Sequence, residues 1–346
     1  MKNVLMIAYY FPPALTAGTF RTFRFVKYLP ENGWKPLILT LNSNNYNKKE
    51  VDFNLLGGIP IDAEIFRTPA LLVHQKYTNL RMVLNKRKNK SDSIGLSDKY
   101  GTKAGENNDT LVRKVKLFID EVLRIPDVDV GWIPFATLKA LRLIYSKQID
   151  LIYTSGGPFG TLVVGLILKK ITGKPWVVDF RDPFSQNQSI TYNVFKGIRR
   201  YLEKAILRNA DRVIAVTDWL KKSFLECHPE IPEDKVMTIT NGFDPGDFKD
   251  IKPSVNCKFT IGYIGSMYGL HSPAPFLQGL SLLCKESPAL EKKMDVAFIG
   301  PGGDEYKHLV KDLKLADIVR FLGTVSHRDA LQWMVSSNLL LVTLTG

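Results

Sequence analysis

The sequence predicts an α/β protein of two domains, each built around a parallel β-sheet that helices cover on both faces. Its 346 residues exceed the usual size of one domain, and 45% of them are hydrophobic, enough for sizeable cores. Short apolar runs rich in β-branched residues alternate with helical stretches, which is the pattern of repeated βαβ units. After Asn241-Gly242, a polar segment with two prolines interrupts the alternation, which indicates an interdomain linker.

The first domain is expected to span residues 1–245. Its strands are predicted at residues 4–8, 36–41, 150–154, 176–180 and 212–216. Helices are predicted near residues 21–29, 159–171, 194–207 and 219–226. Thr217 or Asp218 is the expected N-cap of the last helix, because either side chain can accept a hydrogen bond from a free helix N–H group. The stretch around residues 86–110, rich in Lys, Asn, Ser, Asp and Gly, predicts a loop.

The linker is predicted at residues 246–257, and the alternation restarts in a second domain at residues 258–346. Its strands are expected at residues 259–264, 296–299, 319–321 and 339–344, and its helices at 274–285, 306–315 and 328–336. The sequence ends on Thr345-Gly346, directly after the last of these strands. Because a crossover helix and further strands normally follow such a strand, the second domain is predicted to be incomplete.

Composition favours a protein of a reducing compartment without a membrane span. Cys227, Cys257 and Cys284 lie far apart, with no C-x-x-C pair and no His cluster nearby, which argues against a disulfide framework or a zinc site. The apolar run near the N-terminus is broken by Pro12 and Pro13, so a first strand fits it better than a signal peptide. No apolar stretch approaches the ~20 residues that a transmembrane helix needs. We therefore expect a cytoplasmic protein.

The formal charge of +13 is concentrated in one segment. Residues 74–116 contain eleven Lys or Arg against four acidic residues, which accounts for about half of the excess. Such a basic insertion attracts anionic lipid headgroups or the phosphates of a nucleic acid. A solvated insertion without a partner explains the same charges equally well.

Motifs of several common enzyme classes are missing from the sequence. No G-x-G-x-x-G follows the first strand, and neither G-x-x-x-x-G-K-[ST] nor H-E-x-x-H occurs. Dinucleotide-dependent redox chemistry, P-loop phosphoryl transfer and zincin hydrolysis therefore lose support. Asp127-Val-Asp129 matches the D-x-D metal motif of a sugar-transfer fold, but it follows Pro126 in irregular sequence, so we expect no metal there.

Two glycine-bearing turns of the first domain are candidate ligand contacts. Gly18 and Thr19 open a helix, whose N-terminal N–H groups suit a phosphate or a sugar hydroxyl. The alternative use of this glycine is tight packing between strand and helix. Gly156 and Gly157 lie in a second glycine-rich turn, T-S-G-G-P-F-G, which either shapes the same cleft or is a tight turn.

The segment V-V-D-F-R-D-P-F places three charged residues at the carboxyl end of an expected central strand. They are Asp179, Arg181 and Asp182. Open α/β sheets bind ligands at this end of their strands, so these residues are candidates for the functional site. An Asp-Arg ion pair that holds a loop is the structural alternative, and the sequence leaves both open.

In the second domain, I-G-Y-I-G-S at residues 261–266 and F-I-G-P-G-G at residues 298–303 are turns after strands. Their glycines allow a ligand to approach the backbone. Two such turns after parallel strands of one domain indicate one rim of a nucleotide pocket, with Gly265, Ser266, Gly300 and Gly302 as candidate contacts.

The motifs occur in a characteristic order: Y-F-P-P, G-T-F-R, G-W-K-P-L-I-L-T, V-V-D-F-R-D-P, E-K-A-I-L-R-N-A-D-R-V-I-A-V-T, I-T-N-G-F-D, Y-I-G-S, F-I-G-P-G and V-R-F-L-G-T-V. This order is similar to that of family 4 glycosyltransferases with the GT-B fold. The resemblance spans nearly the whole chain except roughly residues 43–130. The D-F-R-D-P variant resembles members found in bacterial surface-polysaccharide gene sets.

The resemblance implies two doubly wound Rossmann-like domains facing each other across a cleft. The first takes a glycan or lipid-linked acceptor, and the second takes a nucleotide-diphosphate sugar. Transfer retains the anomeric configuration and needs neither a metal nor another cofactor, because positioned hydrogen-bond donors stabilise the leaving diphosphate. We expect no nucleic-acid partner. Peripheral attachment to the inner face of the cell membrane through the basic insertion would suit a lipid-linked acceptor.

The resemblance also assigns roles to the candidate residues. Those with an implied catalytic role are Asp182, Asp179 and Arg181. Those on the acceptor side are Arg21, Gly156 and Gly157. Those that contact the donor are Gly18, Thr19, Gly265, Ser266, Gly300 and Gly302.

The sequence departs from the family pattern at two places. Many members carry an Arg and a Lys that grip the diphosphate after the first strand of the second domain, where this chain supplies Ser266 and His271. The family's Glu, seven residues, Glu motif and its C-terminal crossing helix would follow Gly346. Little turnover is therefore expected from residues 1–346 alone. The alternatives are a non-catalytic module that binds an anionic partner, and a sugar-nucleotide 2-epimerase of the same architecture.

Overall fold

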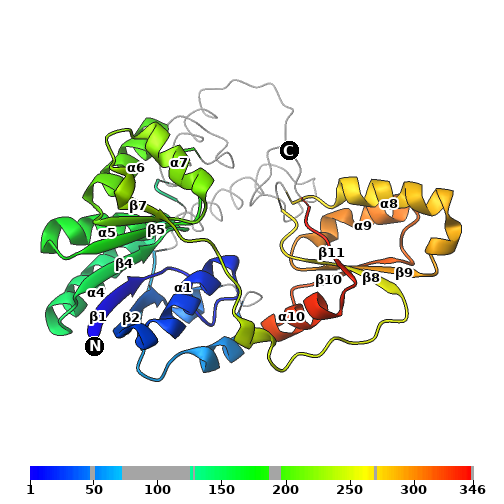
Figure 1. Cartoon of the computed structure of the whole chain (residues 1–346), viewed down its shortest axis with the longest axis horizontal. Coiled ribbons are helices and arrows are strands. Elements are labelled where there is room, and N and C mark those ends of the chain that lie inside the picture. The colour runs from blue at the N-terminus through cyan, green and yellow to red at the C-terminus, as the bar shows by residue number, and fades with distance from the viewer. Residues whose placement is uncertain (47–50, 72–124, 128, 187–195, 269–270, 344–346) are drawn as a thin grey trace, which may run out of the picture. The chain divides into compact units, whose positions relative to one another are not determined.

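The structure is a computed structural model that describes residues 1–46, 51–71, 125–127, 129–186, 196–268 and 271–343. The basic segment at residues 74–116 and the expected loop at 86–110 lie outside the described residues. The chain divides into two compact units after Gly242, called here the N-terminal and the C-terminal unit (Figure 1).

The N-terminal unit is built on a sheet of seven described strands, all parallel, in the order β3-β2-β1-β4-β5-β6-β7. The strands are β1 (Lys2–Ile7), β2 (Trp34–Leu41), β3 (Glu64–Thr68), β4 (Leu151–Ser155), β5 (Trp176–Phe180), β6 (Arg212–Ala215) and β7 (Val236–Thr238). The order reverses between β1 and β4. In open α/β sheets, the carboxyl ends of the strands at such a switch point form the ligand-binding crevice.

Helices cover both faces of this sheet because its strands are apolar on both sides. Along β1, Val4 and Met6 belong to the cluster beneath α1 (Ala17–Tyr28), whereas Leu5 and Ile7 belong to the larger cluster on the opposite face. This follows from the two-residue period of a strand. The larger cluster is completed by α4 (Ile133–Ser146), α5 (Gly160–Thr172), α6 (Lys196–Asn209) and α7 (Asp218–Cys227).

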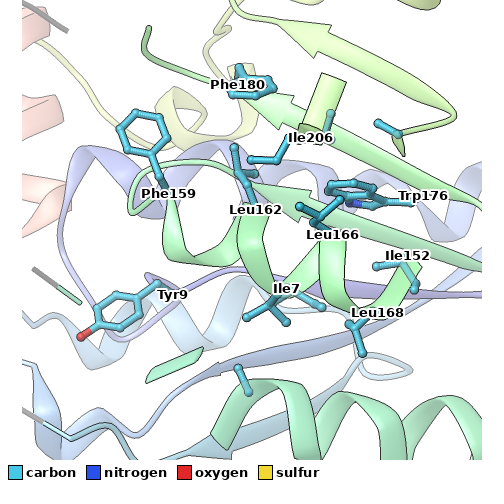
Figure 2. Packing of buried hydrophobic residues seen from close by; sticks show 14 of the residues in the cluster. Ile7, Tyr9, Ile152, Phe159, Leu162, Leu166, Leu168, Trp176, Phe180 and Ile206 are labelled. Carbon is cyan, nitrogen blue, oxygen red and sulfur yellow. The ribbon is translucent and has the colours of Figure 1, made fainter. Parts of the chain in front are cut away.

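Figure 2 shows how α5 fills the centre of the larger cluster. Leu162 and Leu166 of α5 lie over the sheet among Ile7, Ile152 and Trp176. Trp176 is fully buried, and its indole N–H donates to the hydroxyl of Thr154 on the neighbouring strand at 2.9 Å. The apolar residues of the strands therefore form the core on which the helices pack, as the sequence predicted.

The C-terminal unit has a sheet of four described strands, again parallel, in the order β10-β9-β8-β11. Its strands are β8 (Phe259–Ile264), β9 (Met294–Ile299), β10 (Val319–Gly323) and β11 (Leu339–Leu340), and its helices are α8 (Ala274–Glu286), α9 (Lys307–Asp312) and α10 (His327–Ser336). A separate core forms around Phe298, Val296 and Leu277. The two parallel sheets confirm the predicted α/β class.

Short 3-10 turns join these elements, at Pro30–Asn32, Ser43–Asn45, Phe53–Gly58, Val130–Trp132, Glu233–Lys235, Pro245–Phe248, Pro288–Leu290 and Gly303–Tyr306. No helix within the described parts of the chain is long and apolar enough to cross a membrane.

Candidate functional site

The loops at the carboxyl edge of β1, β4 and β5 bring several of the predicted residues together. Arg181, just after β5, contacts the start of α1 at Gly18 and the turn after β4 at Gly156 and Gly157. These loops flank the switch point of the sheet, where ligands bind in this architecture. Three segments far apart in sequence thus meet around one guanidinium group.

Backbone carbonyls hold this guanidinium group. Its Nε donates to Gly156 O at 2.5 Å, and its Nη1 and Nη2 donate to Gly18 O and Gly157 O. Three of the five N–H groups of a guanidinium are used in this way, and within the described residues the other two make no hydrogen bond. Burial lowers the pKa of Arg181, and the charges of Asp179 and Asp182 oppose that shift.

Side chains in place of Gly18 and Gly157 would crowd the guanidinium group of Arg181. A Cβ atom on Gly157 would lie 2.9 Å from Arg181 Nη2, and one on Gly18 would lie 3.2 Å from Nη1. Gly157 also has a φ of +94°, which a residue with a side chain rarely adopts. The sequence predicted ligand contact, tight packing or a tight turn for these glycines, and in the structure Gly18 and Gly157 also make room for an arginine.

Asp179 forms a buried ion pair with Arg21 of α1. Arg21 Nε donates to Asp179 Oδ2 at 2.7 Å and Nη2 donates to Oδ1 at 3.0 Å, which is a bidentate geometry. The Tyr153 hydroxyl donates to the same carboxylate at 2.5 Å. Asp179 is fully buried, so it faces protein donors and not solvent. The ion-pair interpretation thus applies to Asp179, with Arg21 and not Arg181 as its partner.

Arg21 also ties α1 to the segment after β7. Its Nη2 donates to Ile239 O at 2.7 Å, and its Nη1 donates to Thr240 O at 3.0 Å and to Asn241 Oδ1 at 3.2 Å. Burial acts to lower the pKa of Arg21, but the hydrogen bonds and charge of Asp179 outweigh it and raise this pKa. Burial, followed by the Asp179 charge, raises the pKa of Tyr153 well above its usual range, so the phenol remains a donor.

Asp182 is the exposed carboxylate of the three-residue group. Within the described residues it makes no hydrogen bond or ion pair, although it lies close enough to Arg181 to act on its pKa. The loop that carries it is fixed immediately downstream, where Phe184 stacks on Phe159 with ring centroids 4.4 Å apart. Asp182 is therefore available to a ligand on an anchored loop.

A buried carboxylate that the sequence did not single out anchors the same loop. Glu203 Oε2 accepts from the Ser185 amide at 2.9 Å, and its Oε1 accepts from the Ser185 hydroxyl at 2.7 Å. The Nε2 of buried His228 lies 2.9 Å from Glu203 Oε1. The sequence signal that could have identified Glu203 is its place as a charged residue on the inner face of a predicted helix.

The two aspartates of the D-x-D match are engaged by the protein itself. Asp127 accepts the amide of Gly160 at 2.7 Å and the amide of Asp129 at 2.9 Å, so it caps the start of α5. Asp129 accepts the Tyr9 hydroxyl at 2.8 Å. Burial, followed by the Asp129 charge, raises the pKa of Asp127 to about 7. These contacts give the pair a role in fixing the loops beside the switch point.

Two of the other predicted contacts at α1 are already occupied. Thr19 is fully buried, and its Oγ1 lies 3.2 Å from Thr16 Oγ1. The carbonyl of Gly18 accepts from Arg181. What α1 presents to a ligand is therefore the backbone N–H groups of its first turn, other than that of Thr19, which donates to Thr16 O at 2.9 Å.

In the C-terminal unit, the turns after β8 and β9 lie against each other. The Gly265 amide donates to Ile299 O at 2.9 Å, and a Cβ atom on Gly300 would lie 1.9 Å from Gly265 O. Gly302 has a φ of +97°, and a Cβ atom there would lie 2.9 Å from Met267 O. These glycines serve packing between the two loops. Ser266 is exposed on this rim.

Comparisons with known proteins agree with this architecture. Residues 100–247 match the family model described as Glycosyltransferase Family 4. No curated protein sequence matches the chain. Sucrose-phosphate synthase from Thermosynechococcus elongatus is similar over 100% of this chain and 77% of its own, with a TM-score of 0.63 and 14% identity.

Two further solved structures share the fold. A point mutant of TarM from S. aureus, in complex with fondaparinux, alpha-GlcNAc-glycerol and UDP, has a TM-score of 0.60 and 12% identity over 99% of this chain and 81% of its own. An alpha,alpha-trehalose 6-phosphate synthase from Burkholderia multivorans has a TM-score of 0.58 and 11% identity over 99% and 76%. At such identities the likeness concerns the fold alone.

Proposed function

We propose that the chain is a family 4 glycosyltransferase, because residues 100–247 match that family model, and that it moves a sugar from a nucleotide-diphosphate sugar to a glycan or lipid-linked acceptor with retention. The observation that carries this proposal is the convergence of Arg181, Asp182 and the start of α1 at the switch point of the N-terminal sheet. This edge is where a parallel α/β sheet binds its ligand.

In the N-terminal unit, Asp182 and Arg181 are the residues proposed to touch the acceptor. The exposed carboxylate of Asp182 accepts a hydrogen bond from the acceptor hydroxyl, which orients its oxygen for attack. The two free N–H groups of Arg181 donate to a sugar or phosphate oxygen. Asp179 and Arg21 do not touch substrate in this proposal. They hold the loops, because the ion pair between them is buried.

In the C-terminal unit, the rim formed by the turns after β8 and β9 is proposed to take the nucleotide diphosphate. Gly265, Gly300 and Gly302 keep the rim narrow and free of side chains, and Ser266 offers a hydroxyl. The sequence G-S-M-Y-G-L-H-S-P supplies no Arg or Lys after β8. Hydrogen bonds from hydroxyl and backbone N–H groups are therefore proposed to hold the leaving diphosphate.

The test is release of nucleoside diphosphate from uridine, guanosine and adenosine diphosphate sugars, with and without glycan and lipid-linked acceptors. Asp182→Asn should lower kcat by about 100-fold or more, the usual effect of losing a positioned proton acceptor. Asp234→Asn is the matched control, because Asp234 is exposed in the same unit and lies in the 3-10 turn before β7. Product anomers identified by NMR report on retention.

Three outcomes would count against the proposal. If no donor binds or turns over with any acceptor, the chain is a binding module. If a uridine sugar is converted to its 2-epimer without acceptor, the epimerase alternative holds. If Asp182→Asn and Asp234→Asn have the same activity as the unaltered protein, the assignment of Asp182 is wrong even if transfer occurs.

A further inference from the structure

The helices α4, α5 and α6 present an almost acid-free outer surface. Together they carry nine Lys or Arg, of which Arg199 is buried, and one acidic residue, Glu203. Glu203 is buried against His228 and Ser185, so it offers no negative charge to solvent. By contrast α7, the next helix along the chain, carries both Asp218 and Glu226.

Large apolar side chains are exposed on the same three helices. Tyr145 and Leu138 of α4 are 75% and 60% exposed, Ile171 of α5 is 56% exposed, and Tyr201 of α6 is 72% exposed. α5 packs against α4 on one side and α6 on the other, so the three form one continuous layer (Figure 1). Isolated exposed residues are ordinary, but four of them on three adjacent cationic helices indicate an interaction surface.

Several of the cations on this layer have no partner within the described residues. Arg142 of α4, Lys170 of α5 and Arg208 of α6 make no side-chain hydrogen bond or ion pair there. Lys169 and Lys204 differ, because they pair with Asp211 and Glu230. The unpaired charges are therefore free to meet an external anion.

We propose that this outer layer of α4, α5 and α6, the cationic face, docks the protein on a membrane surface that contains anionic lipids. Unpaired Lys and Arg side chains are attracted to lipid phosphates, while Tyr, Leu and Ile enter the boundary between headgroups and acyl chains. Tyr is well suited to this boundary because its ring is apolar and its hydroxyl stays wet.

A nucleic acid explains this face less well. It would use the cations and could stack on tyrosines, but it gives Leu138 and Ile171 no favourable environment. A lipid surface uses both kinds of side chain. This proposal can be tested separately from sugar transfer, because binding to vesicles is measured without a sugar donor or an acceptor.

The test compares vesicles of phosphatidylcholine with and without phosphatidylglycerol. The triple variant Arg142→Gln, Lys170→Gln, Arg208→Gln should bind the anionic vesicles about 100-fold more weakly, from about fivefold per cation. The control variant Lys249→Gln, Lys252→Gln, Lys258→Gln removes the same charge from exposed lysines of the C-terminal unit. It should bind within a few-fold of the unaltered protein.

Two measurements locate the contact. Tyr145→Ser with Tyr201→Ser should weaken binding at every salt concentration, because the apolar contribution is not screened, whereas the cationic contribution falls as salt rises. Hydrogen exchange of α4 and α6 should slow on anionic vesicles while that of α8 stays unchanged. Circular dichroism confirms that these surface variants remain folded.

The proposal is overturned if the triple variant binds anionic vesicles as tightly as the unaltered protein, because the attachment then lies elsewhere in the chain. It is equally overturned if neutral vesicles bind as well as anionic ones. If the triple substitution abolishes tight binding to double-stranded DNA while vesicles do not bind at all, the partner is a nucleic acid instead.

Discussion

Replacing Asp179 by alanine should destabilise the N-terminal unit by about 3–5 kcal/mol, because it leaves the buried guanidinium of Arg21 without its counter-ion. The substitution removes the acceptor of two Arg21 hydrogen bonds, at 2.7 and 3.0 Å, in an environment from which solvent is excluded. The hydroxyl of Tyr153 loses its acceptor at the same time. An unsatisfied buried donor such as the Tyr153 hydroxyl costs about 1–3 kcal/mol, so we expect a destabilisation in the upper half of the ~3–5 kcal/mol range.

An exposed pair in the C-terminal unit provides the matched control. Arg320 and Asp295 also form a bidentate ion pair, with Nε to Oδ1 at 3.1 Å and Nη2 to Oδ2 at 2.5 Å. The Arg320 side chain is 49% exposed, however, so solvent competes for the pair. Asp295→Ala should therefore cost about 1 kcal/mol or less.

The assay is urea denaturation at neutral pH, with hydrogen exchange to assign each transition to its unit. A loss for Asp179→Ala no larger than that for Asp295→Ala would refute the argument that burial of the charge sets the cost. The double variant Arg21→Met, Asp179→Leu offers a second check. Because it removes both charges and refills the space, it should recover much of the stability that Asp179→Ala loses.

The strands that the sequence predicted well are the ones whose residues are apolar on both faces. The expected strands at 176–180 and 259–264 coincide with β5 (Trp176–Phe180) and β8 (Phe259–Ile264). The sequence predicts Thr217 or Asp218 as the N-cap of α7. In the structure, the Thr217 hydroxyl accepts a hydrogen bond from the Leu220 amide at 3.1 Å. Local patterns suffice where local burial and capping determine the structure.

The two strands that the sequence missed lack those local signals. β3 is an edge strand that is only partly buried, and its Glu64 forms ion pairs with Lys35 and Lys147. β7 has three residues. α4 has no side-chain cap at its start and no glycine at its end, but Pro134 in its first turn and the buried residues Ala136, Ala140 and Leu143 at helical spacing do indicate a helix. For β3 and β7, packing against the rest of the unit stabilises an element that its own residues barely indicate.

For the candidate site, the sequence singled out residues that the structure brings together, but not the pairings among them. It grouped Asp179, Arg181 and Asp182, yet Asp179 pairs with Arg21, which lies 158 positions away. The glycines at 18, 156 and 157 were singled out as ligand contacts or turn residues, and their use as acceptors for Arg181 depends on the tertiary fold. Contacts of this range leave no periodic signal in one sequence.

Three further changes test how the site is held. Gly157→Ala should destabilise the protein by about 1–3 kcal/mol and displace Arg181. Gly173→Ala is the control, because Gly173 also has a positive φ but has open space around it, so its loss of stability reports the backbone strain alone. Equal losses of stability in the two variants would argue against crowding between residue 157 and Arg181. Glu203→Ala should cost about 3 kcal/mol and speed hydrogen exchange in the loop after β5, and an unchanged exchange rate would show that the loop is held by other contacts. The pKa of Asp127 is raised from 3.8 to about 7, so the folded state binds the proton more tightly than the unfolded state does. Its contribution to stability is therefore fully present below pH ~4 and is lost as pH rises through 7, by up to about 1.4 kcal/mol per pH unit. The difference in unfolding free energy between the unaltered protein and Asp127→Asn, measured by urea denaturation across this range, should fall with rising pH. A difference that stays flat would mean that the amides at the start of α5 offset the cost of burying the charge.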